Sequence, residues 1–341
     1  MNYGSDTMKK YLVKRILGII PALVGLSILI FILTRLMPGD SIRLAAGTDA
    51  TPAQIEALRV EMGLDKPLYI QYFNYVKGLF TGDWGLSLRT KRNVFLDIRD
   101  TFAATFELSL VGMIFAVAIG VPMGVIAAVR NNKLSDQIIR VTSLSGIALP
   151  RFFLAILLQF FFSYVLGWFP VIGRGKVVPE VITGLRLIDS LLTLNFAAFA
   201  SSFQHILLPA LALAIASAAQ IMRLTRTNML EQLNKEYIVA ANSYGLPNNL
   251  IYNRYMLKNA FISVLTTIGM QFSSLIGSAF LVETVFGWPG MASYSIAGLM
   301  YKDYNAIIGV TMVIGVIFAV SNLLVDIAYG ILDPQIRLGK A

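Results

Sequence analysis

Long uncharged stretches alternate with short polar segments along this chain of 341 residues. A helix needs about 20 mostly apolar residues to cross a hydrocarbon core of about 30 Å. The pattern therefore predicts an all-α membrane protein with six transmembrane helices. The first of them is longer than the apolar core of about 7–15 residues in a signal peptide and no A-x-A site follows it, so we expect it to remain as a helix. The six predicted spans are 16–33, 108–129, 152–173, 205–222, 260–282 and 304–325.

The positions of lysine and arginine predict the orientation, because cytoplasmic loops are enriched in both. With the N-terminus counted as the first loop, the odd-numbered loops hold fourteen of these residues and the short loops on the other side hold four. The segment between the first two spans exceeds 60 residues and is not counted. Both termini are therefore expected on the cytoplasmic side.

The start of the third predicted span has two interpretations, because Arg151 interrupts the apolar run. The span starts either near Ile139, which buries Arg151, or after Arg151. A charge at bilayer depth costs about 2.5–3.5 kcal/mol on insertion scales, which favours the later start unless the guanidinium faces a polar cavity. The plainer alternative is an arginine at the membrane interface that snorkels to the headgroups.

A polar segment, residues 35–106, separates the first two spans on the extracytoplasmic side. Thr51 is placed to cap a helix, Pro52 suits its first position, and Gln54 completes a capping box. Gly63 is placed to end that helix in the left-handed conformation. The segment is too short for a sizeable core of its own, so we expect a small insertion that caps the membrane part.

The insertion is also expected to contain a turn at 82–85, followed by a short strand at 86–88. The distribution of apolar and charged residues along the chain favours a division into three parts around one membrane core. These parts are a tail with the first helix (1–34), the insertion (35–106), and a core of five helices (107–341) that includes a cytoplasmic loop at about 231–260.

Composition supports the membrane class and narrows the chemistry. Apolar residues make up 56% and charged residues 14%, and the mean hydropathy is +0.69, whereas soluble domains average about 25% charged residues. The absence of cysteine excludes disulfides and thiolate metal sites, and a single histidine excludes two-histidine metal sites within the chain. The net charge of +9 is explained by cytoplasmic loops, so no nucleic-acid partner is expected.

No catalytic motif is present, so we expect no enzyme. The sequence lacks a G-x-S-x-G elbow and a phosphate-binding loop, and His205 lies at a span edge where an imidazole needs no special role. An ion-coupled carrier usually places carboxylates at mid-membrane, but Glu107, Glu283 and Asp326 all fall at predicted span edges. Amides and hydroxyls either line a solute path or join helices. They are Gln159, Gln220, Gln271, Ser273, Ser274 and Ser278.

Two further features concern helix contacts. Gly120 and Gly124 are four residues apart, which permits close packing of a neighbouring helix. On the cytoplasmic side, the stretch 236–247 has helix-forming residues and then a stop at Gly245, with Pro247 two residues beyond. Small side chains at 240 and 241 leave a face that another surface can approach. Such a helix either transmits force or is only a helical turn in a surface loop.

This cytoplasmic stretch resembles the EAA loop of ABC-importer permeases, in the version of the dipeptide/oligopeptide/nickel family. The residues that carry the resemblance are Glu236, Ala240, Ala241 and Gly245, then Ile251, Asn259 and Ala260. Further similar motifs follow in the family's order along nearly the whole chain. They lie at 36–40 (L-x-P-G-D), 62–68, 71–72, 82–87, 105–108, 282–291, 303–304, 322–326 and 333–337.

Some positions depart from the family pattern. The family usually has basic residues where this chain has Asn242 and Tyr244, and a proline where it has Ser263. These residues leave the helix intact, but they change the charges available for pairing with an ATPase.

The resemblance implies a fold and a set of partners. The fold would be that of a type I ABC importer permease, in the cytoplasmic (inner) membrane, and the long loop after the first span points to the B-type subunit. Its partners would be a homologous C-type permease, two ABC ATPases that use ATP and Mg²⁺, an extracytoplasmic solute-binding protein, and membrane lipid. The chain itself would bind no cofactor. Peptides are the default cargo, nickel chelates and oligosaccharides are alternatives, and an ion-coupled secondary carrier is the competing class.

The resemblance also implies roles for particular residues. Coupling to an ATPase would involve Glu236, Ala240, Ala241 and Gly245. A translocation path is expected to involve Arg151, Gln159, Gln220, Gln271 and Ser274. The outer mouth would include Glu283, Trp288, Pro289 and Gly290, for which a tight turn needed only for packing is the alternative.

Overall fold

The computed structural model describes residues 3–36, 41–46 and 50–332. The motif segments at 37–40 and 333–337, and the last basic residue Lys340, lie outside the described residues. Within those ranges the chain is built from helices. The all-α class predicted from the hydrophobic pattern is therefore confirmed.

The helices follow one another along the described chain. The first helix and the insertion comprise α1 (Tyr3–Leu36), α2 (Ser41–Ala46), α3 (Pro52–Glu61) and α4 (Leu68–Thr81). The middle comprises α5 (Val94–Val129), α6 (Leu134–Ala148), α7 (Arg151–Leu158), the π-helix η1 (Gln159–Val165), α8 (Arg186–Leu192) and α9 (Phe196–Gln232). The remainder comprises α10 (Glu236–Ser243), α11 (Asn248–Leu250), the π-helix η2 (Ile251–Met256), α12 (Leu257–Val285), α13 (Met291–Met300) and α14 (Tyr304–Leu332).

Five of the described helical stretches are long and apolar enough to cross a membrane. They are Leu17–Leu36, Val94–Val129, Phe196–Gln232, Asn248–Val285 and Tyr304–Ile327. A bent pair, α6 with α7 and η1, makes the sixth crossing if it is one broken span. The described residues thus contain five spans, or the predicted six when the bent pair counts as one.

The predicted third span, 152–173, is wrong at its end. The helix starts at Arg151, close to the later of the two starts considered, and reaches only Val165 through η1. Residues 166–173 do not continue it. α6 precedes it at an angle of 104°. Pro150 explains the break, because proline has no N–H to donate and excludes the helical conformation from the residue before it, which is extended here.

α5 and α9 pack against each other and contribute much of the largest buried apolar cluster. A Cβ atom added at Gly124 would lie 2.6 Å from the Cβ of Thr225, and one added at Gly120 would lie 2.7 Å from the carbonyl oxygen of Ala218. Both separations are shorter than a van der Waals contact. The close approach predicted from Gly120 and Gly124 is confirmed.

Gly124→Val is expected to destabilise the chain by about 1–3 kcal/mol, as overpacking of a tight contact does. The added atoms would meet the backbone carbonyl of Met222 as well as Thr225, and a backbone cannot move aside cheaply. Gly25→Val in α1 is the matched control, because a Cβ there meets nothing within 4 Å. Thermal unfolding in detergent should give a lower midpoint for the Gly124 variant only. Equal midpoints would contradict the tight packing of α5 on α9.

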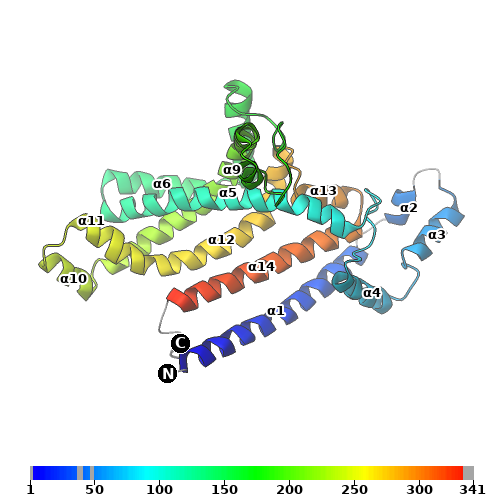
Figure 1. Ribbon diagram of the computed structural model, residues 1–341, viewed down its shortest axis with the longest axis horizontal. Coiled ribbons are helices and arrows are strands. Elements are labelled where there is room, and N and C mark those ends of the chain that lie inside the picture. Colours follow the sequence, from blue (N-terminus) through cyan, green and yellow to red (C-terminus); the bar gives the residue numbers. More distant parts are fainter. Residues whose placement is uncertain (1–2, 37–40, 47–49, 333–341) are drawn as a thin grey trace.

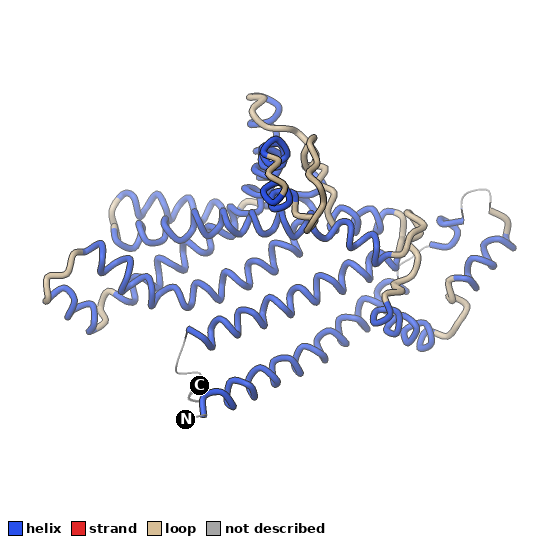
Figure 2. The backbone as a smooth tube through the Cα atoms, viewed as in Figure 1, coloured by secondary structure: helices blue, strands red, loops and turns tan. Residues whose placement is uncertain are grey.

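The long helices lie side by side (Figure 1), with α14 between α1 and α12 and with α12 next to α9 and α5. The start of α1, the turn between α5 and α6, the short α10 and the end of α14 all lie at one end of the bundle, and α2, α3, α4 and α13 lie at the other (Figures 1 and 2). The loops that their lysine and arginine content assigned to one side of the membrane therefore lie at the same end of the bundle.

The start of the insertion is folded as its sequence predicts. Thr51 caps α3, and the capping box is complete because the Thr51 N–H donates to Oε1 of Gln54 at 2.9 Å while the Gln54 N–H donates to Thr51 Oγ1 at 3.4 Å. Gly63 has φ +64° just beyond α3. The helix bounds and both end signals are thus confirmed.

The strand expected at 86–88 is wrong. Leu86 forms a single antiparallel bridge with Asn93. The chain reverses at once, because the Ser87 N–H donates to the carbonyl of Arg92 at 2.8 Å. So short a reversal leaves room for one bridge and for no strand. The turn expected at 82–85 is present, with positive φ at its first and last glycines.

Candidate functional site

The predicted cytoplasmic helix exists as α10, and its ends follow the sequence signals. It starts at Glu236 and ends at Ser243, and Gly245 has φ +70°. Ile238 and Ala241 are 1% and 7% exposed. They pack in a cluster with residues from the ends of α5, α9, η2 and α12, which are Ala128, Met229, Ile251, Met256 and Ala260. α10 is therefore a fixed part of the fold and not a loose helical turn.

The opposite face of α10 is open. Glu236 and Ala240 are exposed, and Val239 and Tyr244 are 57% and 84% exposed. The two alanines were expected to serve one approaching surface, but Ala241 points into the core beneath the helix and only Ala240 faces outward. The exposed face thus combines one carboxylate, small side chains and Tyr244.

Two long helices hold α10 at the end of the bundle (Figure 1). α9 extends ten residues past the predicted end of its span at 222, to Gln232, and helical structure on the other side of α10 begins at Asn248. At 1.5 Å per residue the extension of α9 is about 15 Å long. The flanking helices rather than flexible loops connect α10 to the membrane part.

Three of the predicted path residues come together where α7, α9 and α12 meet. The Arg151 guanidinium donates to Ser278 Oγ and, at 3.5 Å, to Ser217 Oγ. Ser217 donates to Gln271 Oε1 at 3.4 Å, and Gln271 Nε2 donates to Gln220 Oε1. We call these five residues the polar centre. Ser217 was missed, because a single serine inside an apolar run gives no sequence signal.

The charge of Arg151 is uncompensated within the polar centre. Among the described residues no carboxylate forms an ion pair with it, and its partners are hydroxyls. Ionisable groups inside membrane segments are costly and mark functional sites by default. Arg151 also occupies the first position of α7, where the helix dipole adds positive potential. The polar centre is thus suited to contact an anionic or strongly polar group.

The other two predicted path residues lie elsewhere. Gln159 Nε2 donates to the carbonyls of Val171 and Val285 at 2.8 and 2.9 Å, so Gln159 fastens the loop after η1 to the end of α12. Ser274 is exposed, and its carbonyl accepts a hydrogen bond from Ser278 Oγ at 2.6 Å. Neither side chain is a member of the polar centre.

The residues assigned to the outer mouth are mostly buried. Glu283 accepts hydrogen bonds from Thr105 Oγ1 at 2.6 Å and from the Ser293 N–H at 2.9 Å. Trp288 is 1% exposed and donates Nε1–H to the carbonyl of Ala104 at 2.9 Å. A Cβ at Gly290 would lie 2.2 Å from a Glu283 carboxylate oxygen. Of the four residues, Pro289 alone is exposed. This geometry favours the packing alternative for the other three.

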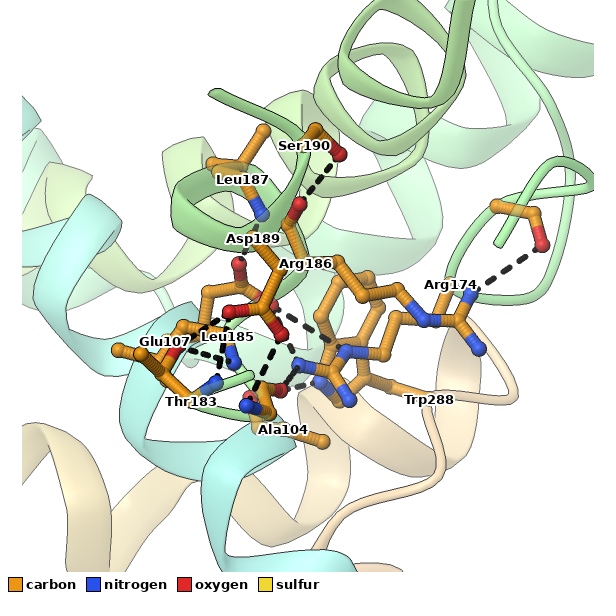
Figure 3. A network of polar contacts seen from close by, with 12 residues as sticks. Ala104, Glu107, Arg174, Thr183, Leu185, Arg186, Leu187, Asp189, Ser190 and Trp288 are labelled. Atoms are coloured by element: carbon orange, nitrogen blue, oxygen red, sulfur yellow. Dashed lines mark hydrogen bonds and ion pairs between the residues drawn. The ribbon is translucent and has the colours of Figure 1, made fainter. Parts of the chain in front are cut away.

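A buried ion pair joins the loop after η1 to α5 (Figure 3). Arg174 and Glu107, with side chains 9% and 5% exposed, are 2.6 Å apart. The other carboxylate oxygen of Glu107 accepts the Leu187 N–H at 2.7 Å, and the Arg174 guanidinium lies 5.8 Å from the centroid of the Trp288 ring. Glu107 lies within α5, which begins at Val94.

Asp189 organises the same loop from α8. Burial by itself raises the pKa of Asp189, but hydrogen bonds outweigh burial and leave the pKa below its ordinary value. Thr183 Oγ1 and the N–H groups of Thr183 and Gly184 donate to its carboxylate at 2.6, 2.8 and 2.9 Å. The ionised carboxylate therefore holds the turn at 183–184, whose Gly184 carbonyl accepts from Arg174 at 2.8 Å.

Comparison with known proteins decides the family. Residues 120–338 match the family described as binding-protein-dependent transport system inner membrane component. Residues 8–109 match the N-terminal family of the same membrane components. The chain belongs to this family. It is therefore a permease component of an ABC importer and a multi-pass protein of the cytoplasmic membrane.

Relatives of the permease match over nearly its whole length. The dipeptide transport system permease protein DppB of Alkalihalophilus pseudofirmus is 38% identical over 97% of this chain and 100% of its own length. The probable D,D-dipeptide transport system permease protein DdpB of Escherichia coli is 38% identical, with coverage of 96% and 97%. The glutathione transport system permease protein GsiC of Escherichia coli is 35% identical, with coverage of 97% and 99%.

A solved structure of the MetNI methionine ABC transporter in inward-facing conformations contains a similar chain. The permease matches it with a TM-score of 0.46 and 17% identity, over 70% of the permease and 93% of that chain. Among the described residues of the permease, no group of three or more His, Cys, Asp or Glu side chains is placed to hold a metal ion.

Proposed function

We propose that this permease is the B-type transmembrane subunit of an ATP-driven importer of di- or oligopeptides. Its partners would be a homologous C-type permease, two ABC ATPases and an extracytoplasmic binding protein that delivers the peptide. The names of the relatives, which include dipeptide and glutathione permeases, support a peptide cargo. The sequence contains no phosphate-binding loop, so ATP and Mg²⁺ would be used by the ATPases.

The observation that carries this proposal is the open face of α10. A helix that is packed on one side by Ile238 and Ala241, and open on the other, can be moved by a partner without losing its fold. We assign Glu236, Ala240 and Gly245 to contact with an ATPase, and we place this end of the bundle in the cytoplasm. Ala241 would support the contact from beneath.

The polar centre is the proposed part of the translocation path. Arg151, Gln220 and Gln271 offer one cation and two amides, which suit the termini and the backbone amides of a peptide better than an apolar solute. Gln159 and Ser274 would act at the edges of the path. At the outer end, exposed Pro289 is the mouth residue best placed to meet a partner.

Reconstitution tests the proposed function. The complex purified with its partners is placed in liposomes, and uptake of labelled di- and tripeptides is measured with and without the binding protein and ATP. We expect peptide uptake only when both are present. Uptake driven by an ion gradient without ATP would favour a secondary carrier, and ATP-dependent uptake of a nickel chelate or an oligosaccharide but not of peptides would overturn the cargo assignment.

Arg151→Cys is expected to react with a charged, membrane-impermeant thiol reagent in at least one nucleotide state, because the path must admit water. The permease has no cysteine of its own, so the new thiol is its single target. Leu154→Cys on the same helix is the control and should stay unreactive, since Leu154 is only 9% exposed. Modification is read as a mass increase of the permease chain. If the Arg151→Cys variant stays unmodified in every nucleotide state, Arg151 does not line the path.

A further inference from the structure

The helix α4 carries three strongly exposed aromatic side chains. Tyr69, Phe73 and Phe80 are 74%, 69% and 88% exposed, and their spacing places them on one side of the helix. Tyrosine and other amphipathic aromatic residues gather where a membrane meets water. This face is therefore expected at the level of the lipid headgroups, next to the end of α1 (Figure 1).

The opposite face of α4 packs on α1. The rings of Tyr72 and Phe31 lie 5.4 Å apart, and Tyr72 and Ser27 share a hydrogen bond of 2.9 Å. Beside this contact the two helices separate and leave a cavity of about 820 Å³, which α2, the end of α3 and α14 complete. That volume lies within the range of about 300–1,000 Å³ found for ligand pockets.

The wall of the cavity is mostly apolar. Ile28 and Ile32 of the membrane-spanning helix α1 line it, and they are 41% and 49% exposed. Leu36 and Leu68 line it further along and are 72% and 59% exposed. A hydrocarbon chain that followed these side chains would cover surface that is otherwise uncovered.

Two arginines line the cavity, and they differ in their charge partners. Arg59 forms an ion pair with Glu56 at 3.4 Å. The guanidinium of Arg35, within the membrane helix α1, lies 5.0 Å from the centroid of the Phe31 ring and 5.9 Å from that of Tyr304, and none of the described acidic residues forms an ion pair with it. Arginine in such a position binds phosphate well, because its planar fork donates several hydrogen bonds to one anion.

Polar atoms around Arg35 also lack partners. Nε of Arg35 and Oε1 of Gln71, on two residues that line the cavity, are buried without a hydrogen bond. Gln71 uses only the nitrogen of its amide, where Nε2 donates to the carbonyl of Lys66 at 2.6 Å. Buried polar groups are normally satisfied, so one unused N–H donor and one unused amide oxygen point to a ligand that carries both an anion and a hydroxyl group.

We propose that this cavity binds a membrane phospholipid with an anionic, hydroxyl-bearing headgroup, such as phosphatidylglycerol. Its phosphate would accept hydrogen bonds from Arg35, a headgroup hydroxyl would donate to Gln71, and an acyl chain would lie along Ile28 and Ile32. Basic pockets beside membrane helices recognise headgroups by these contacts. A soluble anion such as free phosphate would satisfy Arg35 but would leave the apolar wall uncovered.

Native mass spectrometry of the delipidated complex, titrated with phosphatidylglycerol, tests the site. Wild type is expected to bind the lipid, and Arg35→Gln is expected to bind it at least about tenfold more weakly, a loss of about 1.4 kcal/mol. Ile32→Trp keeps the charge but fills the cavity, and it should also lose the lipid. Arg99→Gln, an exposed cation on α5 outside the cavity, is the matched control and should bind like wild type.

Three outcomes would overturn the lipid site. Equal binding by wild type and Arg35→Gln would show that Arg35 does not contact the headgroup. Equal binding of phosphatidylcholine and phosphatidylglycerol would show that the site does not select an anionic headgroup. Displacement of the lipid by inorganic phosphate would indicate a site for free anions instead. These measurements are made without ATP or peptide, so they do not depend on the proposed cargo.

Discussion

Gly245→Asp is expected to reduce peptide-stimulated ATP hydrolysis of the assembled importer to its unstimulated level, while the permease still inserts into the membrane. Gly245 ends α10 at φ +70°, a conformation that costs other residues about 1–2 kcal/mol. The aspartate also places a negative charge at the C-terminal end of α10, where the helix dipole disfavours it. A Cβ at Gly245 meets nothing within 4 Å, so the change acts on the exposed face and leaves the core intact.

Two controls separate these effects. Gly245→Asn is neutral and tolerates the left-handed conformation, so it should keep most of the stimulation. Asn248→Asp adds the same charge at the exposed start of α11, where a helix N-terminus accepts it. Glu236→Arg, which reverses the charge at the start of α10, is expected to uncouple the importer as Gly245→Asp does. Wild-type stimulation in both Gly245→Asp and Glu236→Arg would show that the ATPases act elsewhere.

Arg174→Met is expected to lower the free energy of unfolding of the permease by about 3–5 kcal/mol. The change leaves the Glu107 carboxylate buried without its cation, which costs far more than the loss of an exposed ion pair. The effect should appear as a lower midpoint of chemical denaturation in detergent. Loosening of the loop at 183–184 should accompany it, because Arg174 also holds the Gly184 carbonyl.

A control variant in the same loop and a double variant that removes both charges test this explanation. Lys176→Met removes an exposed cation two residues along the same loop and should change stability by less than about 0.5 kcal/mol. The double variant Glu107→Gln with Arg174→Met removes both charges and should regain much of the stability. If Arg174→Met alone unfolds like wild type, the ion pair does not hold the loop to α5.

Local signals were sufficient for the parts of the fold that depend on neighbours in sequence. The capping box at Thr51 and Gln54 and the stop at Gly245 are each set within one helical turn, so the sequence predicts them. The membrane helices follow from their length and apolar content. The close packing at Gly124 was also predictable, because a missing side chain is visible in the sequence.

Features that depend on distant contacts were not predictable in the same way. Arg174 and Glu107 are far apart in the chain, and nothing in either neighbourhood indicates the other. The burial of Trp288 depends on the carbonyl of Ala104. The third span ends at Val165 for a local reason that apolar content hides, since Gly167 follows at φ +64° and Pro170 comes three residues later. Apolar content alone does not distinguish a helix from a packed loop.

The continuity of α9 has a mechanical consequence. Its 37 residues run from Phe196 to Gln232 next to α10, and Asn195, beside the loop held by Asp189, caps its start. At 1.5 Å per residue this helix is about 55 Å long, and Pro209 within it removes one backbone hydrogen bond. A tilt of about 5° would move one end relative to the other by about 5 Å, which follows from that length. Because α5 packs closely on α9 at Gly120 and Gly124, the two helices would move together. A displacement at one surface of the membrane would thus reach the other by leverage, without a relay of small side-chain movements.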